Sequence, residues 1–331
     1  MRHRTFASLF SGGGGADLGA IAAGYTPLWA VEYDPDLAAV YRANLGDHVI
    51  TADVAAVDYT TVPRVHWLHA SPVCTAFSVA NSNRGERDLD MAAAVAVVRA
   101  LHNLQPDYVT IENVSAYQHS ASYRCIVEVL TQLGYFWHAE ILNAADFGVP
   151  QTRRRLIVRA SRDLLPSLPA PTPWRGWYAA IEDLLDTLPA SAFPPWQLAR
   201  LPEEVRESVL FANRSAGETQ QYVASHSPAF SITLQVSRCR AWLFDGQTNT
   251  GATTLTSRPA EEPAFTLTAT TGSKRPVRSW LTSGRVVQLT ARALARLQSF
   301  PDSYVLPERK TTAMTIIGNA VPPLLLKGLA P

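Results

Sequence analysis

The sequence predicts an α/β fold in which a doubly wound, mostly parallel sheet is joined to a second, smaller and irregular domain. Three observations predict it. Over the first 160 residues, short apolar runs alternate with amphipathic stretches at the spacing of βα units. A glycine-rich turn follows the first apolar run, and the alternation stops at a proline-rich stretch near residue 165. In such a sheet the ligand crevice lies at the carboxyl ends of the strands.

Two periodicities define the elements of this sheet. Short apolar runs predict strands over residues 5–10, 27–32, 66–70, 108–112, 136–142 and 156–159. Helical periodicity predicts helices over residues 16–23, 37–44, 89–103 and 120–133. Each of these helices lies between two strands along the chain, as the crossovers of a parallel sheet require.

The second half of the chain has a different texture. Prolines cannot continue a helix or a central strand, and they predict a boundary at Pro166, Pro169, Pro171 and Pro173. Beyond it the chain is rich in Thr and Ser, and residues 263–268 repeat the pattern of 228–233, which predicts paired edge strands. A helical run at 289–299 precedes an apolar segment at 316–326 that needs a core to bury it.

Composition excludes a disulfide-stapled scaffold and gives no membrane-spanning apolar run. The three cysteines, Cys74, Cys125 and Cys239, lie far apart and form no Cys-x-x-Cys pair. This spacing argues against a metal site and favours a reducing, cytoplasmic compartment. Because 29 Lys and Arg nearly balance 28 Asp and Glu, binding of nucleic acid would require a local cleft of arginines.

The glycine-rich turn spans residues 10–17 and includes Phe10, Gly12 and Gly14. Glycine lets the backbone approach a ligand closely and turn into a helix whose N-terminus is electropositive. A plain tight turn is the alternative for the glycine run taken alone. Its position after the first predicted strand favours a cofactor loop.

Two acidic positions extend this interpretation. Glu32 ends the second predicted strand, where a carboxylate holds ribose hydroxyls, and Tyr33 beside it offers an aromatic face to a purine. Asp53 follows a third strand and could accept a hydrogen bond from an adenine amino group, or could simply cap a turn. These features predict a cofactor that contains adenosine, and both nicotinamide and methionine-derived cofactors fit.

Side chains suited to catalysis stand at three predicted strand ends. Cys74 lies on a loop after the central strand, where a thiolate can reach a ligand, although most cysteines are buried small hydrophobes. Glu112 ends the next strand and would make an acid partner for that nucleophile. Arg153 and Arg155 precede a further strand and would share one face of it, unless this basic run is only a solvated surface.

These motifs together resemble the cytosine-5 DNA methyltransferases, and they occur in that family's order. The matching stretches are residues 10–15, 32–33, 53, 70–78, 112–114, 143–150, 151–155, 296–302 and 317–323. The resemblance covers residues 5–160 and 285–327. It implies a Rossmann-like methyltransferase domain formed by residues 1–165 and 285–331, with a target-recognition domain over 171–284.

The resemblance also implies the chemistry. S-adenosylmethionine would be the cofactor, bound by Phe10, Gly12, Gly14, Glu32, Tyr33, Asp53, Asn319 and Val321. Cys74 would attack carbon 6 of a cytosine flipped out of the duplex. Glu112 would bind the ring nitrogen at position 3, and Arg155, helped by Arg153, would hold the carbonyl oxygen. The enzyme would act on double-stranded DNA as a monomer, with a possible cognate restriction endonuclease.

The DNA contacts are expected in two places. Residues 236–285 contain seven basic and three acidic residues, whereas the whole of 171–284 is balanced. The predicted DNA-binding residues are Ser78, Arg238, Arg240, Lys274 and Arg275. The arginines and the lysine are expected to contact phosphates more than base edges.

Two departures from the family pattern stand out. Val73 occupies the place of the usual proline before the nucleophile, and Ala293 follows Arg292 where a glutamate is frequent. Three alternatives remain open on the sequence: a nicotinamide oxidoreductase, an RNA cytosine-5 methyltransferase of the same fold, and a non-catalytic DNA-binding relative. The oxidoreductase leaves Cys74, Glu112 and Arg155 without a joint purpose.

Overall fold

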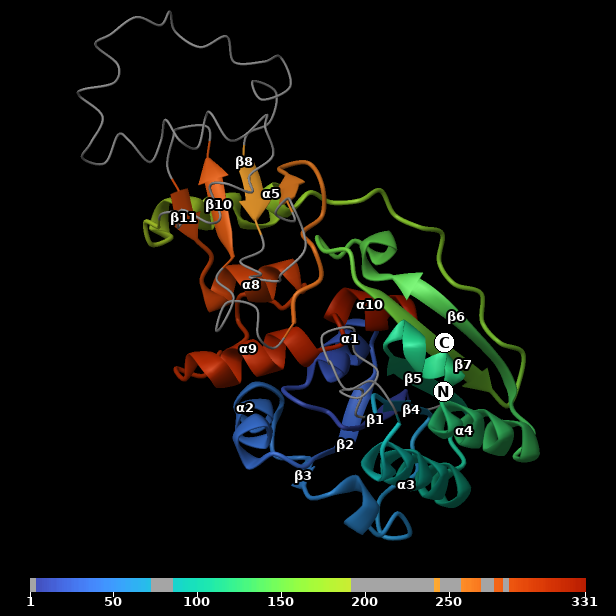
Figure 1. Cartoon of the computed structure of the whole chain (residues 1–331). Coiled ribbons are helices and arrows are strands. Elements are labelled where there is room, and N and C mark those ends of the chain that lie inside the picture. Colours follow the sequence, from blue (N-terminus) through green and yellow to red (C-terminus); the bar gives the residue numbers. More distant parts are fainter. Residues whose placement is uncertain (1–3, 73–85, 192–240, 245–256, 269–276, 282–285) are drawn as a thin grey trace, which may run out of the picture.

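The computed structural model describes residues 4–72, 86–191, 241–244, 257–268, 277–281 and 286–331. Within these ranges the larger sheet has seven strands (Figure 1). In spatial order they are β3 (Val49–Thr51), β2 (Thr26–Glu32), β1 (Thr5–Leu9), β4 (Trp67–Ala70), β5 (Tyr108–Asn113), β7 (Arg154–Ser161) and β6 (Phe136–Asn143). The pairs from β3 to β5 are parallel, and β7 runs antiparallel to both β5 and β6. The doubly wound, mostly parallel sheet is confirmed, and each predicted strand is found within two residues of its predicted ends.

Helices cover both faces of this sheet (Figure 1). They are α1 (Gly15–Ala22), α2 (Pro35–Leu45), α3 (Asp88–Leu104), α4 (Ala121–Gln132) and α10 (Pro323–Gly328). Two further helices, α8 (Ala291–Leu297) and α9 (Lys310–Asn319), pack in a separate apolar cluster that includes Val40 of α2. On one face Leu68 and Val109 pack against the α3 residue Leu101. On the other, Phe6 and Trp67 pack in a cluster with residues of α1 and α10. Successive side chains point to opposite faces, and every residue of β4 and β5 is buried, so the sheet separates two cores.

Local sequence signals explain where these helices begin and end. Asp34 caps α2 because its carboxylate accepts from the Asp36 and Leu37 backbone N–H groups, and Pro35 suits the first turn. Ser120 caps α4 in the same way by accepting from the Tyr123 N–H. The chain leaves α4 through Gly134 at φ 77°, a left-handed conformation that glycine adopts at little cost.

The C-terminal residues return to the first half of the chain. The close approach of α10 to α1 depends on Gly19, because a Cβ there would lie 2.5 Å from the Pro323 carbonyl oxygen. The apolar segment 316–326 is buried as predicted, but it forms the end of α9 and the start of α10 rather than one run. None of the helices in the described part of the chain combines the length and apolar character needed to cross a membrane.

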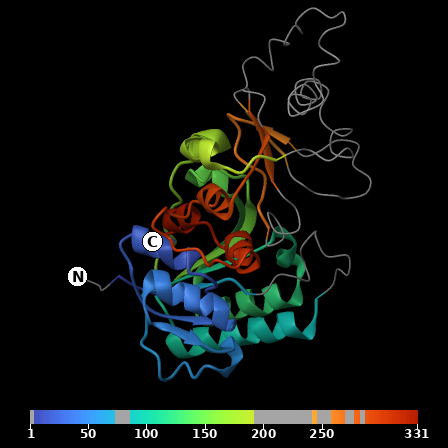
Figure 2. The same ribbon diagram turned by 90° about the vertical axis from the view of Figure 1, so that its left-hand side faces the viewer.

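A second, four-stranded antiparallel sheet has the order β11 (Val286–Gln288), β10 (Arg278–Leu281), β8 (Ala241–Phe244) and β9 (Ser257–Pro259). It lies above α8, with α5 (Trp177–Ile181) beside it (Figure 2). Trp177 and Ile181 share one apolar cluster with Leu294 and Leu297 of α8. This cluster contains residues from both sides of the predicted domain boundary near residue 285. The division into one domain of residues 1–165 and 285–331 and a second domain of residues 171–284 therefore stays a prediction. Residues 228–233, the first half of the predicted strand pair, lie outside the described ranges.

Candidate active site

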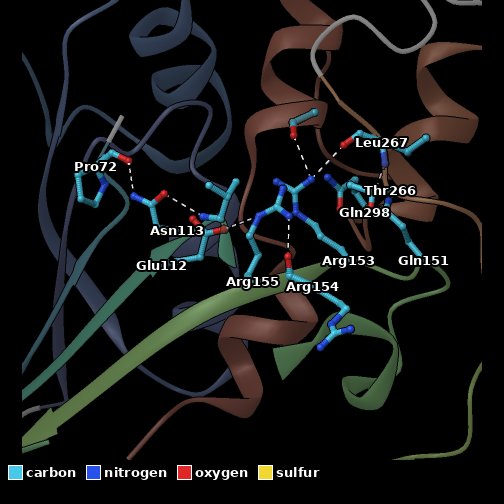
Figure 3. A network of polar contacts seen from close by, with 12 residues as sticks. Pro72, Glu112, Asn113, Gln151, Arg153, Arg154, Arg155, Thr266, Leu267 and Gln298 are labelled. Atoms are coloured by element: carbon cyan, nitrogen blue, oxygen red, sulfur yellow. Dashed lines mark hydrogen bonds and ion pairs between the residues drawn. The ribbon is translucent and has the colours of Figure 1, made fainter. Parts of the chain in front are cut away.

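The carboxyl end of β5 carries a carboxylate that meets a guanidinium from β7. Arg155 Nε lies 2.9 Å from Glu112 Oε1, and these side chains are 14% and 8% exposed (Figure 3). Glu112 stands opposite Ile157 in the antiparallel register, which places Arg155 on the same face and two residues further toward the carboxyl end of β5. Arg155 Nη1 also donates to the Arg154 carbonyl oxygen at 2.8 Å. Two of the three side chains predicted to act together, Glu112 and Arg155, are therefore in contact at the carboxyl end of β5.

Asn113 holds the chain that leads to Cys74. Its Nδ2 donates to the Pro72 carbonyl oxygen at 3.1 Å, and its Oδ1 accepts from the Val114 N–H at 2.8 Å (Figure 3). The end of β4 is thus tied to the end of β5 two residues before Cys74. Cys74 itself lies outside the described residues, as do Val73 and Ser78. Sequence reasoning gave Asn113 no role, although it stands in the Glu-Asn-Val motif.

Arg153 precedes β7 and is 2% exposed. Its Nη1 donates to the carbonyl oxygens of Leu267 at 3.0 Å and Gly318 at 3.1 Å, as Figure 3 shows in part. These contacts join the strand start to a segment of the predicted recognition region and to α9. The predicted help of Arg153 in holding the base stays a prediction, and the structure adds this anchoring task.

The segment 264–267 runs alongside residues 150–152 as a short parallel bridge. The Ala264 N–H donates to the Pro150 carbonyl, and the Thr152 N–H donates to the Ala264 carbonyl at 2.8 Å. Thr266 Oγ1 adds a bond to the Thr152 carbonyl at 2.7 Å. The second half of the internal repeat is therefore fixed to the chain that enters the active site.

The glycine loop and Glu32 form one unit at the carboxyl ends of β1 and β2. Glu32 Oε2 accepts from the Gly12 N–H at 2.7 Å, and Oε1 accepts from the Asp34 N–H at 2.8 Å. Gly12 has φ 55°, and a Cβ there would have no heavy atom within 4 Å, so the backbone faces open space. Burial raises the pKa of Glu32 above its ordinary value, against the effect of these hydrogen bonds.

The other predicted cofactor residues surround this unit. Tyr33 is 72% exposed, so its ring is available beside Glu32. Asp53 is exposed, and its Oδ1 accepts from the Ala55 N–H at 2.8 Å, which is the turn-cap geometry. The turn after α9 lies against the loop, since a Cβ on Gly15 would be 2.8 Å from the Val321 carbonyl oxygen. Asn319 is exposed at the end of α9.

A buried carboxylate beneath the loop was not assigned from the sequence. Asp17, in the first turn of α1, accepts from Ser8 Oγ at 2.8 Å and from the Tyr41 hydroxyl at 2.8 Å. The Tyr41 hydroxyl also bonds to His48 Nε2 at 2.9 Å. Burial raises the pKa of Asp17 to about 6. In the sequence, only the position of Asp17 at the end of the glycine-rich turn could have drawn attention to this residue.

The predicted DNA contacts Arg238, Arg240, Lys274 and Arg275 fall outside the described residues. Within the described residues there is no group of three or more His, Cys, Asp or Glu that could hold a metal ion. The structure therefore describes the carboxylate, the guanidinium and the glycine loop of the candidate site.

Comparison with known proteins gives consistent matches over the whole chain. The family model described as C-5 cytosine-specific DNA methylase matches residues 4–331. Type II methyltransferase M1.HphI of Haemophilus parahaemolyticus is 28% identical over 343 residues, covering 98% of this chain and 85% of its own. Type II methyltransferase M.AplI of Arthrospira platensis is 31% identical over 330 residues, covering 97% of this chain and 83% of its own.

Solved structures share the fold. A protein encoded within an E. coli prophage, described as a DNA modification methyltransferase, superposes with a TM-score of 0.66 at 20% identity. That alignment covers 98% of this chain and 97% of the other. The Dnmt2 methyltransferase of S. pombe gives a TM-score of 0.60 at 14% identity, covering 98% and 96%. At these identities the likeness supports the α/β methyltransferase fold alone.

Proposed function

The chain belongs to the C-5 cytosine-specific DNA methylase family, and on this premise we propose that it methylates carbon 5 of a cytosine within a specific sequence of double-stranded DNA. The observation that supports this most is the contact between Glu112 and Arg155 at the crevice edge. The carboxylate and guanidinium stand beside the strand end that leads to Cys74. S-adenosylmethionine is the proposed methyl donor.

Carbon 5 of an aromatic cytosine is a poor nucleophile toward a methyl donor. The reaction therefore needs a nucleophile on the enzyme that first activates the ring. Addition of the Cys74 thiolate to carbon 6 forms a carbon–sulfur bond and makes carbon 5 nucleophilic. Cytosine within a duplex is shielded by stacking, so the base must first be flipped out into the crevice. After methylation, solvent water takes the carbon-5 proton, the electron pair of that bond re-forms the 5,6 double bond, and the carbon–sulfur bond breaks to return the thiolate.

Glu112 supplies the proton that this addition requires. After the carboxylate takes up a proton, it donates that proton to ring nitrogen 3 as negative charge builds on the ring, and its other oxygen accepts from the exocyclic amine. Arg155 donates from its guanidinium to the carbonyl oxygen of the same ring. The ion pair holds the two side chains in place before the base arrives, so little reorganisation is needed.

The residues present fit the proposed cofactor. The backbone at Gly12 faces open space, and the Glu32 carboxylate beside it can accept further hydrogen bonds from ribose hydroxyls. Tyr33 presents an exposed ring for the adenine. When bound, S-adenosylmethionine supplies an electrophilic methyl group. The roles of Phe10, Gly14, Asp53, Asn319 and Val321 are proposed from the family motifs.

A labelled methyl-transfer assay tests the proposal. The purified protein is incubated with methyl-labelled S-adenosylmethionine and either genomic duplex DNA or transfer RNA, and the modified nucleosides are separated. Label in 5-methyl-2′-deoxycytidine supports the proposal, and label in RNA favours the RNA enzyme. A Glu112→Gln variant that still binds the cofactor serves as the negative control. Bisulfite sequencing of the product then gives the target sequence.

The recognition region, partners and assembly are part of the same proposal. Residues 171–284 would read the target, with Ser78 and the cluster Arg238, Arg240, Lys274 and Arg275 contacting DNA. The enzyme would act as a monomer, and a cognate restriction endonuclease would cut the unmethylated target. A steep fall in DNA affinity with rising salt, reduced when the four basic residues are replaced, would support the assignment of the cluster.

A further inference from the structure

A buried tyrosine from the C-terminal segment contacts the back of the glycine loop. The Tyr304 hydroxyl donates to the Gly13 carbonyl oxygen at 2.7 Å, although the two residues are 291 positions apart. Tyr304 is 2% exposed and its ring packs against Phe300 with centroids 4.8 Å apart. The contact therefore lies in a dry environment, where a hydrogen bond is strong and directional.

The loop backbone is shaped for this contact. A Cβ on Gly13 would lie 2.5 Å from the Tyr304 hydroxyl oxygen and 2.6 Å from Ile316 Cγ2. Neither distance is compatible with a side chain at this position unless the neighbours move. Gly13 therefore allows Tyr304 and α9 to approach the main chain of the loop directly.

The turn that carries Tyr304 is itself fixed from two sides. Arg292 Nη2 donates to the Tyr304 carbonyl oxygen at 2.6 Å, and Nη1 donates to the Pro301 carbonyl at 3.3 Å. From α2, Asn44 exchanges two hydrogen bonds with the backbone of Val305, at 2.6 and 3.0 Å. The Tyr304 hydroxyl is thus held at one place by elements of both halves of the chain.

We propose that Tyr304 is a positioning residue for the cofactor, acting through the backbone of the glycine loop. Three hydrogen bonds fix two peptide groups of the loop, one between Ser11 and Gly12 and the other between Gly13 and Gly14. The Gly12 N–H donates to Glu32, the Gly13 carbonyl accepts from Tyr304, and the Gly14 N–H donates to the Ser11 carbonyl at 2.9 Å. Removing the Tyr304 bond leaves the Gly13–Gly14 peptide group held only through its N–H, in the part of the loop that would face the cofactor. This inference rests on the proposed binding of S-adenosylmethionine at this loop.

The test compares Tyr304→Phe with Tyr108→Phe. Both variants remove only a hydroxyl from a buried tyrosine that donates to a main-chain carbonyl, since the Tyr108 hydroxyl donates to Leu329 at 3.0 Å. For Tyr304→Phe we expect the Kd for S-adenosylmethionine to rise about fivefold, the size of one neutral hydrogen bond. The KM for S-adenosylmethionine should rise with it, while kcat at saturating cofactor and the KM for DNA stay unchanged. Tyr108→Phe should leave the cofactor Kd unchanged.

A second variant guards against a general loss of folding. Gly13→Ala should weaken cofactor binding. In the double variant Gly13→Ala/Tyr304→Phe, the fold-increase in the cofactor Kd should be smaller than the product of the two single increases, because the missing hydroxyl makes room for the methyl group. Thermal unfolding checks that each variant is folded. Equal cofactor binding by wild type and Tyr304→Phe, or an equal loss in Tyr108→Phe, overturns this inference alone. A wild-type protein that does not bind S-adenosylmethionine overturns the proposed function as well.

Discussion

Glu112 and Arg155 make a 2.9 Å ion pair at the carboxyl end of β5 because their strands run in opposite directions. In a purely parallel sheet, a residue at the start of a neighbouring strand would lie at the far edge from a strand end. Because β7 is antiparallel to β5, its first residues meet the last residues of β5. The antiparallel direction of β7 therefore brings an arginine at the start of this strand beside a carboxylate at the end of β5.

Glu112→Gln tests the proton-donating role. The amide keeps the shape of the side chain but cannot deliver a proton, so methyl transfer should fall by about 10²–10⁴. Leaving the Arg155 guanidinium without its anionic partner should lower the free energy of unfolding by about 1–3 kcal/mol. Methyl-transfer rates and denaturant unfolding measure the two effects.

Glu140→Gln is the matched control for that variant. Glu140 Oε1 lies 3.0 Å from Arg159 Nη2 in an ion pair of the same sheet, between β6 and β7. This substitution should lower stability to a similar or smaller extent and leave methyl transfer unchanged. Equal losses of methyl-transfer activity in the two variants would contradict the proton-donating role of Glu112.

Cys74→Ser tests the covalent route. A serine hydroxyl is a far weaker nucleophile than a thiolate at neutral pH, so methyl transfer should fall by at least about 10³. The cofactor loop comes from other strands, so the Kd for S-adenosylmethionine should not change. A serine variant with full turnover would show that carbon 6 is not attacked by this side chain.

Asp17→Asn tests the buried carboxylate below the loop. Since the pKa of Asp17 is raised from 3.8 to about 6, the folded protein binds a proton that the unfolded chain releases between these values. The proton on Asp17 stabilises the folded protein fully below about pH 4. This contribution to the free energy of unfolding, up to about 3 kcal/mol, is lost as the pH rises through about 6. Asparagine can still accept from Tyr41 and donate to Ser8, so the variant should be more stable than wild type at pH 7.

The stability difference between Asp17→Asn and wild type should therefore grow from pH 4 to pH 7. Denaturant unfolding across this range isolates the contribution of Asp17, because the other titrating groups are common to both proteins. A constant difference would mean that Asp17 titrates at an ordinary value.

Thr266→Val tests the bridge between segment 264–267 and the active-site chain. It removes the bond from Thr266 Oγ1 to the Thr152 carbonyl with little change of shape, at about 1 kcal/mol of unfolding free energy. The KM for DNA should rise and the Kd for the cofactor should not, if this segment orients the recognition region. Thr131→Val, on α4, removes a bond to the Val127 carbonyl and one accepted from Trp137 Nε1, and it should leave both constants unchanged.

The sequence predicted the elements of the sheet well, because each depends on a local pattern. The strand ends that carry Glu32 and Glu112 followed from apolar runs of the expected length. Placing both residues at one crevice needed only the rule that parallel strands end at the same edge. The family resemblance implied that Glu112 and Arg155 act on one base, but neither their ion pair nor the antiparallel direction of β7 was predicted.

Contacts between distant segments could not be predicted in this way. Nothing local to Tyr304 indicates that its hydroxyl meets Gly13, and nothing local to Arg153 indicates the carbonyl of Leu267. Such bonds to main-chain carbonyls leave no pattern of complementary side chains in the sequence. Likewise, both roles of Asp53 were open on the sequence, and the structure shows the turn cap.

Covalent trapping tests the central claim most directly, since it reports the nucleophile, the base and the cofactor together. Plasmid DNA containing 5-fluoro-2′-deoxycytidine is incubated with the protein and S-adenosylmethionine, because fluorine at carbon 5 blocks the proton loss that releases the enzyme. We predict a denaturation-resistant complex that requires the cofactor, with the cross-link mapped by mass spectrometry to Cys74 and lost in Glu112→Gln. A protein that methylates normal DNA but forms no such complex, or forms it through another residue, would contradict the account.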